Sequence, residues 1–308
     1  MSVTAPDARS RPDYRTANVA CGPERQATLD EASPSPSSLV SDNAPAGSWR
    51  DRALTWLAPA LVLAGFLFAW EAYVRLASVP HYILPAPSLI AVTLVEDWPI
   101  LGPALGVTLT ITALALFVAV LGGVALAVLF TQARWASLAF YPFAVVAQVT
   151  PIVAIAPLIF IYVDSRLAGL LVCAWLVAFF PILSSTTLGL RSADHHLRDL
   201  FAIYGASRWQ RLRLLLVPSA LPYFLGGLRI AGGLALIGAV VAEYVAGTGG
   251  IGSGLAFRIL EAGYRLDIPR MFAALVLIAL AGVTIYATLG LISHLALRRW
   301  HESAVGRD

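Results

Sequence analysis

The sequence predicts an all-α, polytopic membrane protein with six membrane-spanning helices. Of its 308 residues, 58% are hydrophobic and only 13% are charged, against about 25% charged residues in an ordinary soluble domain. The mean hydropathy is +0.77. Apolar stretches recur that reach the roughly 20 residues a helix needs to cross a hydrocarbon layer of about 30 Å. The formal net charge of +3 is too small to indicate a nucleic-acid partner.

Residues 1–48 are expected to form a disordered cytoplasmic tail. The segment is rich in Pro, Ser, Ala and Asp and has no helical or strand periodicity, which is typical of chains that cannot bury a core. No apolar run follows its arginines, so it is not a secretory signal peptide. Residues 301–308 are expected to form a second, short cytoplasmic tail.

Between the tails, residues 49–300 are expected to form one transmembrane domain. Prolines mark the loop after the first apolar stretch, and the glycine-rich residues 247–254 mark the last outer loop. The six expected spans are 53–76, 104–130, 138–162, 167–189, 222–245 and 271–297.

The third span carries Pro142, Pro151 and Pro157, with Gln148 and Thr150 between the first two. Proline removes helical hydrogen bonds, and backbone groups freed in this way are tolerated in a membrane where they line a cavity. This pattern predicts a pore-lining helix, with Gln148, Thr150 and Pro151 on the translocation path.

The fifth span is dense in small residues, which let helices approach closely. The sequence leaves open whether they pack within one subunit or across a dimer. These residues are Gly226, Gly227, Ala231, Gly232, Gly233, Ala235, Gly238 and Ala239.

Orientation follows from the arginines near the helix ends, because short positively charged loops stay in the cytoplasm. With the N-terminus inside, the inner segments hold most of these arginines, and residues 190–221 form a basic cytoplasmic loop. Both termini are therefore expected in the cytoplasm.

Several chemistries are excluded by residue usage. All 21 Lys-or-Arg residues are arginines, so the chain lacks the lysine of a P-loop or of a pyridoxal enzyme. Two cysteines and five scattered histidines give no disulfide framework and no zinc spacing. We expect no catalytic residues, no metal and no cofactor, and therefore no enzyme activity in this chain.

The basic loop 190–221 reads as two short helices. Ser192 or Asp194 is placed to cap the first helix, and Gly205 stands where a helix end favours positive φ. Ser207 followed by Gln210 predicts a capping box for the second helix.

Pro218 and Pro222 are expected to end the second helix. The first helix presents an apolar face that is too small for a membrane span and too large for a bare cytoplasmic surface, so it favours a protein partner. An amphipathic pair lying on lipid headgroups is the alternative. The face consists of Leu197, Leu200, Phe201 and Tyr204.

The loop resembles the EAA loop of ABC importer permeases, which joins the membrane subunit to the ATPase. Asp199 stands at the position of the Glu, Leu200 and Phe201 replace the two Ala, and Gly205 and Pro218 are in register. The residues assigned to ATPase coupling by this resemblance are Asp199, Leu200, Phe201, Gly205, Ala206, Ser207, Leu215 and Pro218.

The resemblance extends over about residues 53–300 and is closest to the nitrate, sulfonate and taurine type of permease. The Gln148–Pro151 segment resembles members associated with thiamine-pyrimidine or riboflavin-type precursors. The stretches that carry the resemblance are residues 70–71, 84–88, 150–158, 205–209, 221–223, 227–229 and 242–243.

The resemblance implies a transmembrane permease domain with a type I ABC importer permease fold, in a bacterial plasma (inner) membrane and without an ATPase of its own. It implies as partners a pair of cytoplasmic ABC ATPase subunits, a periplasmic or extracellular solute-binding protein, a second copy of this chain and the lipid bilayer. ATP-driven closure of the ATPase pair is expected to push the two loops and so move the outer gate.

Charged residues inside the spans are functional candidates. Glu71 and Glu243 lie near outer helix ends, where an interfacial position is the alternative, and the resemblance favours Glu243 as an outer-gate or dimer-contact residue. Arg229 precedes Glu243 by about 21 Å of helix, so the two cannot pair directly. Arg229 is expected to snorkel inward or brace the loop.

The competing function is a secondary transporter driven by an ion gradient. Such a protein needs coupling carboxylates near the membrane midplane and often has an inverted repeat. Neither feature is evident in the sequence.

Overall fold

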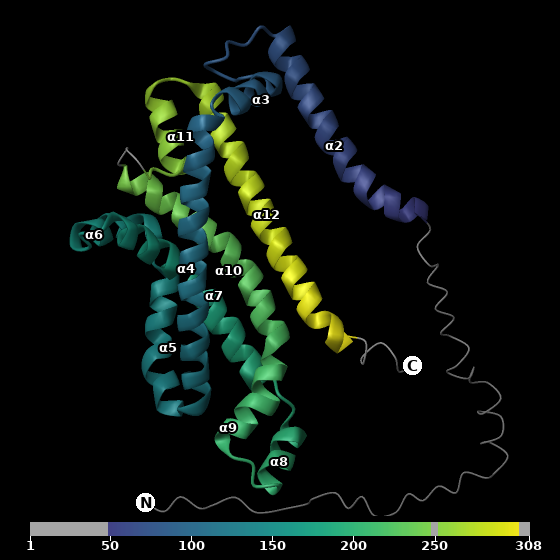
Figure 1. Cartoon of the computed structure of the whole chain (residues 1–308), viewed down its shortest axis with the longest axis vertical. Helices are drawn as coiled ribbons and strands as arrows, with labels where there is room; N and C mark the ends of the chain where they lie inside the picture. The colour runs from purple at the N-terminus through teal and green to yellow at the C-terminus, as the bar shows by residue number, and fades with distance from the viewer. Residues whose placement is uncertain (1–48, 248–251, 302–308) are drawn as a thin grey trace, which may run out of the picture. The chain divides into compact units, whose positions relative to one another are not determined.

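The computed structural model describes residues 49–247 and 252–301, and within them it contains helices and loops but no strand (Figure 1). Contacts divide the chain into two units, Met1–Ala64 and Gly65–Asp308. The described part of the first unit is the start of helix α2 (Trp49–Leu76). The expected tail 1–48, nearly all of the expected tail 301–308 and the loop residues 248–251 lie outside the described residues.

The prediction of an all-α membrane protein is confirmed. By length and composition, five helical stretches can cross a membrane, and a bent helix pair makes up to six. The long helices are α2, α4 (Trp98–Gln132), α7 (Arg166–Arg191), α10 (Val217–Ala246) and α12 (Ile268–His301).

The third expected span, 138–162, is not one continuous helix. It consists of α5 (Arg134–Val149) and α6 (Ile152–Tyr162), which are bent by 105° at the break between them (Figure 1). Thr150 and Pro151 are both extended, with ψ of 123° and 118°. The ring of Pro151 disfavours the helical conformation of the residue before it, which accounts for the position of the break.

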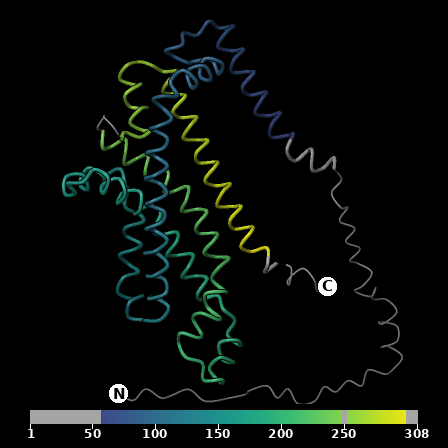
Figure 2. Tube along the Cα trace, viewed as in Figure 1, coloured from purple at the N-terminus to yellow at the C-terminus, as the bar shows by residue number. Residues whose placement is uncertain are grey.

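Two helices occupy segments that the sequence suggested were loops. They are α3 (Pro87–Glu96) and α11 (Leu255–Tyr264). They lie at the end of the second unit opposite to α8 (His195–Ile203) and α9 (Arg208–Arg211), as Figures 1 and 2 show. Arg270, near the start of α12, binds Asp97, which lies between α3 and α4. Its Nε and Nη2 donate to the two carboxylate oxygens at 2.6 and 2.9 Å.

Helix α10 packs along α7 through glycines that bring the two backbones together. A Cβ at Gly227 would lie 2.6 Å from Oγ of Ser185 and 2.9 Å from the carbonyl oxygen of Pro181. A Cβ at Gly238 would lie 2.9 Å from Cα of Ala174. Much of the small-residue pattern of the fifth span therefore serves packing within one chain, whereas Gly226 and Gly233 face open space.

This contrast gives a prediction with a matched control. Gly227→Ala is expected to lower the free energy of unfolding by about 1–3 kcal/mol, because neither the Ser185 side chain nor the Pro181 backbone can move away without separating the helices. Gly226→Ala adds the same methyl group at the adjacent, exposed position and is expected to cause no loss. Thermal unfolding of the two purified variants in detergent measures the difference, and equal stability would contradict the packing argument.

Candidate functional site

Backbone hydrogen bonds fix the conformation of the turn that joins α8 to α9. Gly205 has φ of +63°, as predicted for this position. Its N–H donates to the carbonyl of Ala202 at 3.0 Å, and the N–H of Ala206 donates to the carbonyl of Phe201 at 2.9 Å. These two bonds form a Schellman motif, which fixes the direction in which α8 ends.

Side-chain caps fix the rest of the loop. Asp194, not Ser192, caps α8 by accepting from the N–H of His196 at 2.8 Å, whereas Ser192 ends α7. Ser207 and Gln210 form the predicted capping box at the start of α9, with bonds of 3.2 and 2.8 Å.

The prediction that Pro218 and Pro222 end the second helix is wrong. From α9 the chain continues through a π-helical turn, η2 (Leu212–Leu216), directly into α10, with Pro218 in the first turn of α10 and Pro222 inside it. The π turn just before Pro218 changes the hydrogen-bond register there, so the helix accommodates a residue without an N–H and continues past both prolines. The loop is therefore joined to the fifth span by uninterrupted helix.

An exposed cavity of about 450 Å³ lies on the α8–α9 turn. Leu200 and Tyr204 are 45% and 80% exposed, while Phe201 packs partly against the buried cluster below. Leu215 is buried in that cluster together with Leu190 of α7. The residues assigned to coupling thus divide into a surface group and a buried group. The cavity is lined by Leu200, Phe201, Tyr204, Gly205, Ala206, Gln210 and Leu214.

Asp199 is exposed on α8, and Pro218 is half-buried at the start of α10. Neither lines the cavity on the turn. Ser207 contributes through its cap rather than by lining the cavity.

A second cavity, of about 330 Å³, lies at the break between α5 and α6. Gln148, Thr150 and Pro151, the residues predicted on the translocation path, all line it. The other lining residues are apolar and come from α5, α6, α7 and α10. No charged side chain is among the lining residues in the described part of the chain.

Glu243 lies apart from this cavity and is fully buried, so it is not at a wet interface. Its Oε1 accepts from the hydroxyl of Thr108 on α4 at 2.9 Å, and its Oε2 accepts from the N–H of Ala256 at 3.1 Å. The hydroxyl oxygen of Thr108 accepts from the N–H of Leu255 at 2.9 Å. Glu243 and Thr108 together bind the free N–H groups at the start of α11, and a Cβ at Gly254 would clash with the carboxylate.

Sequence reasoning missed Thr108 because it is 135 residues from Glu243 and because its neighbours Thr110 and Thr112 are threonines of the same span, so nothing in the sequence distinguishes it from them. The other two intramembrane charges have local partners. Glu71 accepts from the N–H and hydroxyl of Ser88 and pairs with Arg75. Arg229 stacks on the ring of Tyr286, 3.7 Å from its centroid.

Asp194, His195 and His196 offer ligand atoms that lie within 4.8 Å of one another. All three side chains are exposed, and Asp194 is already engaged as the cap of α8. The expected absence of a metal therefore stays a prediction.

A helical membrane domain with a broken span and a capped loop that presents a cavity is typical of the membrane subunit of a transport system. Residues 119–302 match the family "Binding-protein-dependent transport system inner membrane component". The chain belongs to this family and is the permease subunit of a binding-protein-dependent ABC importer for a small solute.

Similar proteins agree with this assignment. The riboflavin transport system permease protein RibX of Chloroflexus aurantiacus is 38% identical, over 77% of this chain and 87% of RibX. The formylaminopyrimidine transport permease protein ThiX of Halalkalibacterium halodurans is 31% identical, over 78% of this chain and 95% of ThiX. The taurine transport system permease protein TauC of Escherichia coli is 28% identical, over 77% and 84%.

Two solved structures support the fold. An amino acid ABC transporter crystallised with histidines matches with a TM-score of 0.54 at 19% identity, covering 68% of this chain and 97% of that chain. The structure of the inward-facing MetNI methionine ABC transporter matches with a TM-score of 0.50, also at 19% identity. At this identity the likeness concerns the fold alone.

Proposed function

We propose that two copies of this chain form the channel of the importer. A separate pair of ATPase subunits binds the two α8–α9 turns, and an external binding protein delivers the solute. The α8–α9 turn, residues 190–221 and both termini lie in the cytoplasm. The transported solute is a neutral heterocycle of the riboflavin or thiamine-precursor kind.

The ATPase contact is supported by the cavity on the turn and by its rigid attachment. Leu200 and Tyr204 are exposed apolar side chains with a hollow beside them, which is typical of a docking surface. Leu215 anchors the second helix in the core, and that helix runs without a break into α10. Movement of the turn is therefore transmitted directly to the fifth span. Since the chain has no lysine, ATP hydrolysis by a P-loop must come from another chain.

The orientation is supported by how the arginines at the two ends are neutralised. At the α11 end, Arg258 and Arg265 pair with Glu261, and the guanidinium of Arg258 holds the pKa of the Glu261 carboxyl below its ordinary value. Arg270 pairs with Asp97. At the α8–α9 end, no arginine pairs with a carboxylate within the described residues, so the uncompensated positive charge lies on the proposed cytoplasmic side.

The solute class is supported by the lining of the cavity at the α5–α6 break. This is the observation that carries the proposal. Gln148 supplies an amide donor and acceptor, and Thr150, whose hydroxyl donates to the carbonyl of Val146 at 2.7 Å, supplies an acceptor. Helix ends such as those at the break also leave backbone groups without partners in their own helix. A heterocycle with ring N–H and carbonyl groups can use both kinds of group, whereas nitrate and sulfonate carry only acceptors and a full charge. RibX and ThiX are also more similar to this chain than TauC.

The experiment is uptake by the reconstituted importer. The full chain, its ATPase and its binding protein are placed in vesicles, and labelled riboflavin, a formylaminopyrimidine, taurine and nitrate are supplied outside. We expect ATP-dependent uptake of one of the two heterocycles that persists when proton and sodium gradients are collapsed. Uptake that follows an ion gradient would instead favour a secondary transporter, and uptake of taurine or nitrate alone would contradict the solute class.

The path residues are tested with a double variant. Gln148→Leu with Thr150→Val removes both polar side chains of the cavity and is expected to lower uptake about tenfold, the effect of losing two hydrogen bonds of about 0.5–1.5 kcal/mol each. Thr284→Val is the control, because Thr284 on α12 makes the same 2.7 Å bond to a helix carbonyl as Thr150 does, yet is exposed and remote from the cavity. Unchanged uptake by the double variant would place the path elsewhere.

A further inference from the structure

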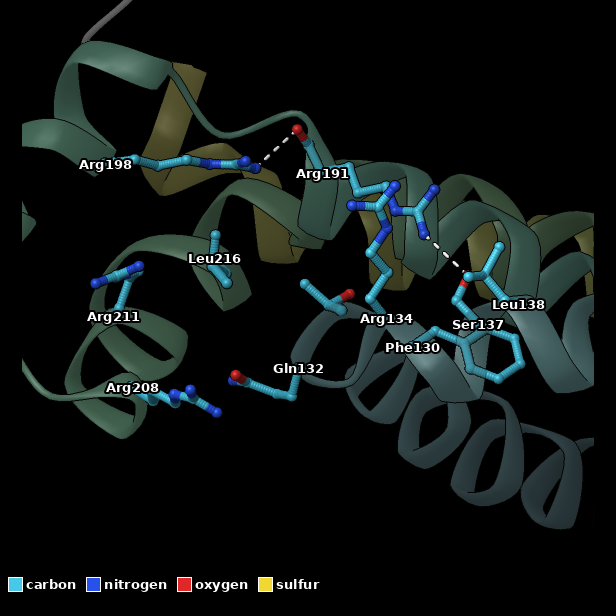
Figure 3. Close-up of a pocket in the computed structure, with 11 residues that line it drawn as sticks. Phe130, Gln132, Arg134, Ser137, Leu138, Arg191, Arg198, Arg208, Arg211 and Leu216 are labelled. Carbon is cyan, nitrogen blue, oxygen red and sulfur yellow. Dashed lines mark hydrogen bonds between the residues drawn. The ribbon is translucent and has the colours of Figure 1, made fainter.

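A larger cavity, of about 670 Å³, lies between the α4–α5 turn and the basic loop. Its polar lining is dominated by guanidinium groups, and no Asp or Glu is among the described residues that line it. Figure 3 shows the arginines approaching from two sides, some from the loop helices and one from the α4–α5 turn. They are Arg134, Arg191, Arg198, Arg208 and Arg211.

Two of these arginines are held by hydrogen bonds, and none of the five pairs with a carboxylate within the described residues. Arg198 donates through Nη2 to the carbonyls of Leu190 and Arg191 at 3.2 and 2.8 Å, and Arg191 donates to the hydroxyl of Ser137 at 3.2 Å. The Nε atoms of Arg198 and Arg211 are buried and have no hydrogen-bond partner in the described structure. Five like charges around one cavity repel each other, so an anion there is strongly favoured.

The shape of the site indicates which kind of anion it takes. A groove of about 360 Å³ between α5 and α7 shares Ser137, Leu138 and Arg191 with the arginine cavity and so continues from it. The remainder of the groove is mainly apolar, with Tyr141, Pro142 and Leu188 among its walls. The combined site therefore has a cationic compartment at the helix ends and an apolar channel along two spans.

We propose that this site binds an anionic phospholipid of the cytoplasmic leaflet, with its phosphate among the arginines and an acyl chain along the α5–α7 groove. Basic pockets at the cytoplasmic ends of membrane helices bind anionic headgroups in this way, and guanidinium groups bind phosphate oxygens in pairs. The assignment to the cytoplasmic leaflet rests on the proposed orientation, but the binding itself does not. A bound lipid joins the α4–α5 turn to the α8–α9 loop and so stiffens the loop against the membrane.

The test is lipid binding to the purified full-length chain, measured by native mass spectrometry. Palmitoyl-oleoyl phosphatidylglycerol is titrated against phosphatidylcholine with the same chains. We expect phosphatidylglycerol to be retained at about one lipid per chain, with at least a tenfold preference. Glycerol 3-phosphate is added as competitor to distinguish a lipid site from a site for a soluble phosphate, and it is expected to displace the lipid only at far higher concentration.

The variants separate the two compartments. Arg134→Gln with Arg208→Gln removes two exposed cavity arginines that come from opposite walls, and is expected to weaken phosphatidylglycerol binding about tenfold. Arg213→Gln with Arg298→Gln removes the same charge from exposed positions outside the cavity and is expected to leave binding unchanged. Leu188→Trp, which narrows only the groove, should weaken the lipid but not glycerol 3-phosphate.

Three results would overturn the proposal. They are equal retention of the two lipids, an equal effect of the two double arginine variants, and displacement of the lipid by glycerol 3-phosphate at matching concentration. The last result would assign the cavity to a soluble phosphate compound. None of these measurements requires transport, so they are independent of the proposed solute.

Discussion

Gly205→Val is expected to reduce solute-stimulated ATP hydrolysis and uptake by the assembled importer at least tenfold, while the chain still inserts in the membrane. Gly205 has φ of +63°, a conformation that costs a residue with a Cβ roughly 1–2 kcal/mol, and more for a β-branched one. A Cβ at this position meets nothing within 4 Å in this chain. The defect therefore lies in the turn and in what docks on it, and not in the membrane fold.

The physical reason is the loss of the Schellman motif. When residue 205 leaves the left-handed region, the bonds from Gly205 to Ala202 and from Ala206 to Phe201 cannot both form. The direction of α8 relative to α9 then changes, and the exposed face around Leu200 no longer lies beside the cavity on the turn. The measurement is ATPase activity in vesicles, with the amount of inserted permease determined in the same samples.

Gly205→Asn is the matched control, because asparagine adds a side chain but tolerates positive φ. We expect it to retain most of the coupling if the backbone conformation is what matters. Equal loss in both variants would instead show that the partner needs the space beside residue 205. Wild-type activity of Gly205→Val would exclude a coupling role for the turn.

The loop illustrates how far the sequence predicts this structure. The caps at Ser207 and Gly205 depend on bonds between residues at most five positions apart, so local chemistry is sufficient to predict them. The prediction at Pro218 is wrong because the effect of this proline depends on the preceding π turn, which the pattern of apolar residues does not reveal. The break at Pro151 was foreseen as an interruption, but its 105° bend depends on the packing of α6 against α7 and α10.

Sites formed by segments that are far apart in the chain could not be predicted from the sequence. The arginine cavity combines the α4–α5 turn with α7, α8 and α9, and its members looked individually like ordinary cytoplasmic arginines. Likewise, the sequence identified Glu243 as an unusual charge but could not supply its partners on α4 and α11. Such sites depend on tertiary contacts. The sequence shows how many charged residues there are, but not which of them lie together in the structure.

Glu243→Leu is expected to lower uptake at least tenfold by releasing α11 from α4 and α10. The N–H of Ala256 would be left without an acceptor in a buried position, at a cost of about 1–3 kcal/mol. The hydroxyl of Thr108 would lose its carboxylate partner while still accepting from Leu255. With only the N–H of Leu255 still bound to Thr108, the start of α11 is held less firmly at the end of the domain that is proposed to face outward.

Glu243→Gln separates the hydrogen bonds from the charge. Its carbonyl can accept from Ala256, and its amide can donate to Thr108, whose own proton is then free for the carbonyl of Ala104 at 3.2 Å. We therefore expect α11 to stay in place and the loss of uptake to be the smaller of the two. Hydrogen exchange of the α11 amides, measured beside uptake, is the decisive comparison. If Glu243→Leu leaves the exchange rates and the uptake at the level of the unmodified protein, the carboxylate does not hold α11. Unchanged slow exchange together with lost uptake would instead give Glu243 a role in gating that is separate from anchoring.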